Sequence, residues 1–167
     1  MRRTKLLVFA ALMAALANVL SVPPLAIPLE LGGFTSAFHF FQLAIFVCGI
    51  LAGPWAGLIS GAVGGLYMSV TRIPFVFVGI AILGGSAGLF AKKVRPVFAG
   101  LLAWLVQAPY VVVTDYVWFT LFSGTSPGVA WGLVVSIMIN LTLQAIVCVV
   151  LADIIVHYVK RAGISIR

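Results

Sequence analysis

Charge is scarce in this chain of 167 residues. Only 8% of the residues are charged, with three acidic and ten basic side chains, whereas 63% are hydrophobic. Soluble domains carry about 25% charged and about 45–50% apolar residues, so this composition indicates an integral membrane protein. The net charge of +7 does not indicate nucleic-acid binding, because the basic residues form short clusters between apolar segments rather than one continuous face.

Groups that hold metals or perform catalysis are equally scarce. Cys48 and Cys148 stand in apolar runs, and neither they nor the two histidines have companions at the spacing of a metal site. The chain lacks the H-E-x-x-H, G-x-S-x-G and P-loop motifs. Asp153 and His157, four residues apart, fit a solvated pair at a helix end better than an acid–base pair. We therefore predict no enzyme activity, no metal and no cofactor.

Six apolar segments indicate helices that cross a bilayer. We predict one all-α membrane domain over residues 1–167, with spans at about 6–22, 38–53, 55–71, 73–91, 97–122 and 129–158, and an apolar, proline-rich capping loop at 23–36. The first segment also fits a secretory signal with a small-residue cleavage site at Ala15-Leu16-Ala17, and the sequence leaves this alternative open.

The basic residues predict the orientation of these six spans. With a cytoplasmic N-terminus, Arg72 is the only basic residue on the outer side. Both termini are then cytoplasmic, and the protein is a multi-pass protein of the plasma membrane. The inner set then comprises Arg2, Arg3, Lys5, Lys92, Lys93, Arg95, Lys160, Arg161 and Arg167.

Glycine recurs at every fourth residue from Gly49 to Gly65, across the second and third spans. Residues without side chains at this spacing let membrane helices approach closely. Gly53-Pro54 interrupts the stripe, because proline lacks an amide proton and disfavours helical backbone at the preceding residue. The segment is therefore expected to form a tight hairpin of two helices.

Arg72 and Asp115 are the charged groups that orientation does not explain. Arg72 stands at the outer end of the third span. It either extends to lipid headgroups or pairs with Glu30 or Asp115, or it binds an anionic group of a ligand. Asp115 stands near the outer end of the fifth span, where an ionisable side chain normally faces the bundle interior. Arg72 thus favours a ligand with a carboxylate or a phosphate.

Polar amides at membrane depth gather on the last two spans. Asn140 and Gln144 are one helical turn apart on the last span, and Gln107 is on the span before it. Such groups need a hydrogen-bond partner, either on a neighbouring helix or on a ligand. Trp131 and Ser136 are expected on the same helical face as the two amides. Tyr116, Trp118 and Trp131 either stack on a ligand ring or belong to an interfacial aromatic belt.

The layout of six short spans, an alanine-rich first helix and a capping first loop is joined by a specific block. His39 is followed by GILAGPWAGLISGAVGGL, from Gly49 to Leu66. In these features the chain resembles the substrate-binding S component of energy-coupling factor (ECF) transporters. The resemblance implies high-affinity capture of a vitamin or vitamin precursor from outside, and delivery by toppling in the membrane when docked on a coupling subunit with two cytoplasmic ATPases.

The resemblance also implies a docking face for the coupling subunit. The family's A-x-x-x-A motif matches the first helix in two phases, and the glycine stripe adds to the same flank. The docking candidates are Ala10, Ala11, Ala14, Ala15, Gly53, Gly57 and Gly61.

The substrate does not follow from the resemblance, although the histidine-rich N-terminus of the cobalt and nickel members is absent. The candidate binding residues are Glu30, His39, Arg72, Asp115, Tyr116, Trp118, Trp131, Asn140 and Gln144. The alternative is a structural six-span subunit of a cell-envelope complex, with membrane lipid around it and no small-molecule ligand. A lipid-modifying enzyme would need a catalytic group that the sequence does not provide.

Overall fold

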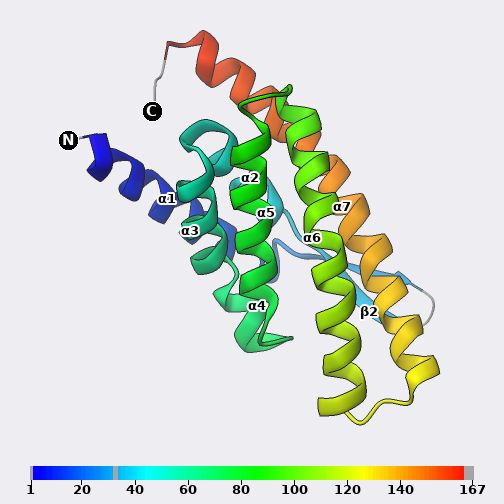
Figure 1. The fold of residues 1–167 in the computed structure, drawn as a ribbon. Helices are drawn as coiled ribbons and strands as arrows, with labels where there is room; N and C mark the ends of the chain where they lie inside the picture. Colours follow the sequence, from blue (N-terminus) through cyan, green and yellow to red (C-terminus); the bar gives the residue numbers. More distant parts are fainter. Residues whose placement is uncertain (1, 32–33, 164–167) are drawn as a thin grey trace.

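The computed structural model describes residues 2–31 and 34–163, without the side chains of residues 2 and 29–36. It is a bundle of helices with one small β-hairpin (Figure 1). The elements are α1 (Arg2–Val19), β1 (Ile27–Leu31), β2 (Phe34–Phe38), α2 (Phe41–Ala52), α3 (Pro54–Gly64), α4 (Leu66–Thr71), α5 (Val76–Phe90), α6 (Pro96–Val117), the π-helical turn η1 (Trp118–Phe122) and α7 (Pro127–Arg161).

The predicted break at Gly53-Pro54 is confirmed. Gly53 adopts φ 99°, a conformation that a side chain would strain, and Pro54 begins α3 with a ring that suits the first position of a helix. A second break was not predicted: the expected span 55–71 is divided at Gly65 into α3 and the short α4.

The all-helical membrane character is confirmed, but the helices are uneven in length. Among the described residues, the two segments that are long and apolar enough to cross a membrane are residues 96–122, formed by α6 with η1, and α7. The apolar helices α2 and α5 have 12 and 15 residues. Twelve residues rise about 18 Å, less than the roughly 30 Å of a hydrocarbon core, and α2 is shorter than the span predicted at 38–53.

The predicted capping loop contains regular structure. Strands β1 and β2 form an antiparallel pair in which Ile27 lies opposite Phe38 and Leu31 opposite Phe34. The physical reason is that backbone amides and carbonyls near hydrocarbon must be hydrogen-bonded, and pairing two short strands achieves this. The alternating apolar residues at 27, 29 and 31, followed by Gly32-Gly33, are the sequence signal for such a hairpin.

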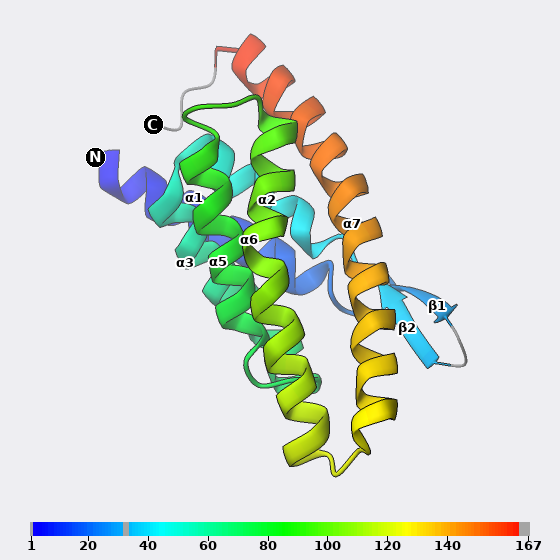
Figure 2. The ribbon, with the colours of Figure 1, turned by 45° about the vertical axis from the view of Figure 1, so that its right-hand side comes forward.

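The two ends of the bundle differ in charge. The start of α1, the connection from α5 to α6 and the end of α7 lie toward one end, whereas α4 and the connection from α6 to α7 lie toward the other (Figures 1 and 2). The first end carries the three basic clusters, including Lys92, Lys93 and Arg95 between α5 and α6. This arrangement is consistent with the predicted orientation.

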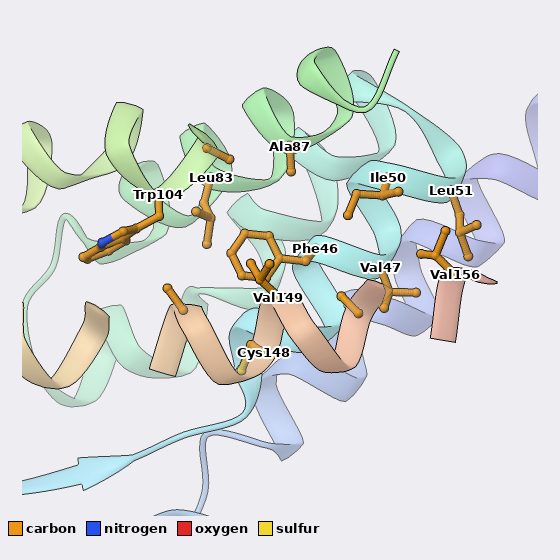
Figure 3. Close-up of a cluster of buried hydrophobic side chains, with 13 residues drawn as sticks. Phe46, Val47, Ile50, Leu51, Leu83, Ala87, Trp104, Cys148, Val149 and Val156 are labelled. Carbon is orange, nitrogen blue, oxygen red and sulfur yellow. The ribbon is translucent and has the colours of Figure 1, made fainter. Parts of the chain in front are cut away.

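Helix α2 lies at the centre of the main hydrophobic cluster. Phe46 on α2 is fully buried, and in Figure 3 its ring lies close to Leu83 of α5 and Val149 of α7. Trp104 brings α6 into the same cluster. The cluster therefore joins the glycine-rich helices to the two long ones.

The glycine stripe packs inside the chain. A Cβ atom at Gly57 would overlap the carbonyl oxygen of Gly84 on α5, and a Cβ at Gly84 would overlap the carbonyl oxygen of Gly57. A Cβ at Gly61 would overlap the carbonyl of Ile80. Close packing by these glycines is thus observed, but their partner is α5. Gly53, Gly57 and Gly61 are buried, so the prediction that they dock a coupling subunit is corrected.

This contact predicts an asymmetric response to adding one methyl group. Gly84→Ala should destabilise the protein by about 2 kcal/mol, because the new Cβ forces α3 and α5 apart. Gly132→Ala on α7 is the matched control: nothing lies within 4 Å of its Cβ position, so the melting temperature should stay constant or rise slightly. Thermal unfolding in detergent measures both. Equal melting temperatures for the two variants would contradict the packing.

Candidate functional site

Polar side chains from separate elements converge on one cavity. It has a volume of about 680 Å³, counted to its open mouth, and its walls come from α4 to α7 and from the segment that joins β2 to α2. Five of the predicted site residues line it: His39, Arg72, Asp115, Asn140 and Gln144.

Helix α6 contributes a polar face to this cavity. Gln107, Val111, Thr114 and Asp115 line it, at the three- and four-residue spacing that keeps side chains on one side of a helix. Gln107 and Asp115 are only 4% and 5% exposed. Eight residues separate them, which corresponds to about 12 Å along the helix axis. Counting back two turns from Asp115, by way of Val111, would have identified Gln107 as a site residue.

Helix α7 holds the β-hairpin over the cavity. The amide nitrogens of Asn140 and Gln144 each donate a hydrogen bond of 3.1 Å to the carbonyl of Ala37 in β2. Gln144 Nε2 also donates to Asn140 Oδ1 at 3.0 Å. The sequence left open whether these amides bind a helix or a ligand. They bind the backbone of the hairpin, while Gln144 Oε1 is buried without a partner among the described groups.

Arg72 occupies the mouth of the cavity. It follows α4 directly, is exposed, and also lines a second cavity, next to the hairpin, with Tyr67 and Thr71. Two hydrogen bonds fix this region: the Phe77 amide donates to Ser69 Oγ at 2.8 Å, and the Tyr110 hydroxyl donates to the Phe75 carbonyl at 3.1 Å.

The predicted pairing of Arg72 has two candidate partners. Among the described side chains, no ion pair joins Arg72 to Asp115. Glu30 belongs to β1, but its side chain lies outside the described part of the chain. His39, in contrast, is described, and it is buried at the edge that the two cavities share.

The three predicted aromatic residues lie elsewhere. Tyr116 and Trp131 pack edge to face, with ring centroids 5.5 Å apart, in a groove between α6 and α7. Trp118 stacks on Phe122 at 5.2 Å. None of the three lines the cavity.

Helix geometry explains this correction. Trp131 precedes Asn140 by nine residues, and nine steps of about 100° place two side chains on opposite faces of a helix. The expectation that Trp131 shares the face of Asn140 and Gln144 is therefore wrong. Tyr116 stands nine residues after Gln107 and is turned away from the cavity for the same reason.

The structure shows which of the small residues of α1 face the bundle and which face outward. Ala10 and Ala14 are buried within the chain, whereas Ala11 and Ala15 are exposed. Asn18 fixes this rotation, because its Nδ2 donates to the Val63 carbonyl at 2.9 Å and its Oδ1 accepts from the Tyr67 amide at 3.0 Å. The pair that remains available to another protein is Ala11 and Ala15.

Comparison with known proteins gives one family. A family model described as "ECF-type riboflavin transporter, S component" matches residues 1–161. No curated protein and no solved structure matches the chain.

The hydrogen bonds to Ala37 predict that α7 controls the mobility of the hairpin. Replacing Asn140 and Gln144 together by leucine removes both donors, so amide hydrogen exchange in β1 and β2 should accelerate by about tenfold or more. Exchange in the centre of α2 should not change. Thr142→Val is the control, because the Thr142 hydroxyl bonds to Met138 within α7. Unchanged exchange in the hairpin of the double variant would refute this role.

Proposed function

Since this chain belongs to the family of ECF-type riboflavin transporter S components, we propose that its cavity captures a vitamin or vitamin precursor from outside the cell. The observation that carries the proposal is the convergence of His39, Arg72, Asp115, Asn140 and Gln144 on one space. These residues come from four separate parts of the chain. A polar contact that only stabilises the fold would not need side chains from so many parts.

The composition of the cavity suits a small organic ligand. Apolar side chains such as Val76, Ile80 and Leu141 form much of the wall, with a few polar groups among them. Binding sites for small molecules usually have this character, since apolar walls supply affinity and a few polar groups fix orientation. A buried carboxyl group such as Asp115 is costly in a membrane protein, and a function at the site accounts for its presence.

The position of Arg72 supports uptake from outside. The mouth lies beside α4, toward the end opposite the basic clusters, and that end is extracellular if both termini are cytoplasmic. Riboflavin is the first ligand to test, given the family, because its planar ring suits apolar walls and its N–H and hydroxyl groups suit the amides.

Delivery of the ligand into the cell requires separate partner proteins. The sequence contains no P-loop, so energy has to come from separate ATPases. We assign the docking of a transmembrane coupling subunit with two cytoplasmic ATPases to the exposed face of α1, where Ala11 and Ala15 permit close approach. Toppling of the S component on that subunit would then carry the ligand inward.

The alternative of a structural subunit without a ligand receives less support. It would leave a buried carboxyl group and, among the described groups, buried amide oxygens without hydrogen-bond partners, and buried polar groups in proteins are normally hydrogen-bonded.

Ligand binding tests the proposed site directly. The purified protein should bind riboflavin, and Arg72→Gln and Asp115→Asn should each weaken binding by about tenfold or more, because a charged side chain forms stronger hydrogen bonds to a ligand than the neutral amide that replaces it. Arg95→Gln and Asp153→Asn are charge-matched controls outside the cavity, and they should bind like the wild type. Quenching of flavin fluorescence measures the dissociation constants. Equal affinity in all four variants would exclude this site.

Docking is tested by a change of size on α1. Ala15→Leu should reduce copurification of the coupling subunit and abolish uptake in cells, while binding of riboflavin by the isolated protein stays unchanged. Gly132→Leu, on α7 with open space around it, should leave both properties intact. If Ala15→Leu transports normally, the docking face lies elsewhere.

A further inference from the structure

A separate cleft lies at the basic end of the bundle, between the start of α6 and the last turns of α7. Arg95 lines it from the α6 side and Lys160 lines it from α7, and it shares no lining residue with the cavity that contains Asp115. We propose that this cleft binds the headgroup of an anionic phospholipid, in the leaflet that is cytoplasmic if both termini are cytoplasmic. The inference concerns a second site and does not depend on what the first cavity binds.

The two cationic groups of the cleft have no carboxylate partner. The acidic residues of the chain are Glu30, Asp115 and Asp153, and only Asp153 belongs to this end of the bundle. Asp153 also lines the cleft, but among the described side chains no ion pair joins it to Arg95 or Lys160. Both cations are exposed, so their N–H groups are available to an anion. A phosphate accepts hydrogen bonds from guanidinium and ammonium groups alike.

The cleft lies where α7 passes from hydrocarbon to water. Helix α7 is long and apolar enough to cross a membrane, and its residues 145–152 are all apolar. Asp153 and Lys160 follow, seven residues apart and therefore near the same face of the helix. Tyr158, which also lines the cleft, is 63% exposed, and tyrosine side chains of membrane proteins gather at the interface with water. Phospholipid headgroups occupy this level.

The walls of the cleft change from apolar to charged in the direction of water. On α7, Ile154 stands six residues, or about 9 Å, deeper in the membrane than Lys160. On α6, which runs in the opposite direction, Val97 stands deeper than Arg95, and both apolar residues line the cleft. A soluble phosphate uses only the charged part. A phospholipid also places the start of an acyl chain against the apolar part, so it fits the cleft better.

Charge gives the expected strength of this interaction. Basic pockets between membrane helices on the cytoplasmic side bind anionic headgroups, and each lysine or arginine there strengthens binding about fivefold. Asp153 acts in the opposite sense, because its carboxylate repels a phosphate. Two cations against one carboxylate leave the cleft with a net attraction for an anionic lipid.

Native mass spectrometry of the purified protein in detergent tests the site. Dioleoylphosphatidylglycerol and dioleoylphosphatidylcholine, which have the same acyl chains, are added together in equal trace amounts. A micelle with so little anionic lipid has no charged membrane surface, so retention reports binding at a site. Wild type should retain phosphatidylglycerol about tenfold or more over phosphatidylcholine. The double variant Arg95→Gln/Lys160→Gln should bind phosphatidylglycerol about tenfold or more weakly than wild type.

A matched control removes the same net charge from the same end. Lys93→Gln/Arg161→Gln changes two residues that do not line the cleft, and it should retain phosphatidylglycerol within about twofold of wild type. Asp153→Asn should retain this lipid about twofold more strongly, because the repulsion is gone. The melting temperature of each variant verifies folding, and the single variants Arg95→Gln and Lys160→Gln, each about fivefold weaker, replace the double variant if it does not fold.

Four results would overturn the proposal. Equal losses in the two double variants would show that retention follows net charge and not this cleft. Weaker retention by Asp153→Asn would contradict the role of charge inside the cleft. Displacement of the lipid by an equal concentration of glycerol 3-phosphate would assign the cleft to a soluble anion. If Arg95→Gln/Lys160→Gln retains lipid like wild type but no longer copurifies with the coupling subunit, the cleft is a protein interface.

Discussion

The architecture depends on backbone contact between α3 and α5. In lipid, apolar side chains gain little by leaving one apolar surrounding for another, so helices associate where their backbones come close. Gly57 and Gly84 meet at such a place, and each carbonyl occupies the space that a Cβ of the other residue would need. This contact, with α2 beside it, packs one half of the protein closely. The cavity lies against the other half, where α6 and α7 carry larger polar side chains.

Hydrogen bonding then determines how the cavity is covered. Asn140 and Gln144 bind the carbonyl of Ala37, so the same residues line the cavity and anchor the hairpin above it. A buried amide has both donors and an acceptor that need partners. The Ala37 carbonyl and Asn140 Oδ1 accept hydrogen bonds from the Gln144 nitrogen, whereas no described group donates to the Gln144 oxygen. Arg72, Gln107 and Asp115 give the cavity a polar character that a lipid-facing groove, such as the one beside Trp131, does not have. The fold and the membership in the S-component family support the same interpretation.

The sequence predicts several of the residues that line the cavity, whereas it does not predict the packing partners. Charged and amide residues such as Asp115 and Gln144 are so costly at membrane depth that their convergence on one cavity follows from composition and spacing. The break at Gly53-Pro54 follows from local backbone chemistry. The partner of the glycine stripe could not be predicted, because small residues indicate close approach without indicating what approaches. The rotation of α1 was undetermined for the same reason, until Asn18 and the burial of Ala10 and Ala14 settled it. The position of Trp131 was predictable from a helical wheel, and the hairpin from the alternation around Ile27 and Leu29.

The most direct test of the cavity as a binding site is an experimental structure of the protein purified together with its ligand. The account predicts density for one small molecule between α6 and α7 beneath β2, in contact with Gln107, Asp115 and Gln144 and extending toward Arg72. Density confined to the groove beside Tyr116 and Trp131, with the cavity empty or filled by side chains, would contradict it.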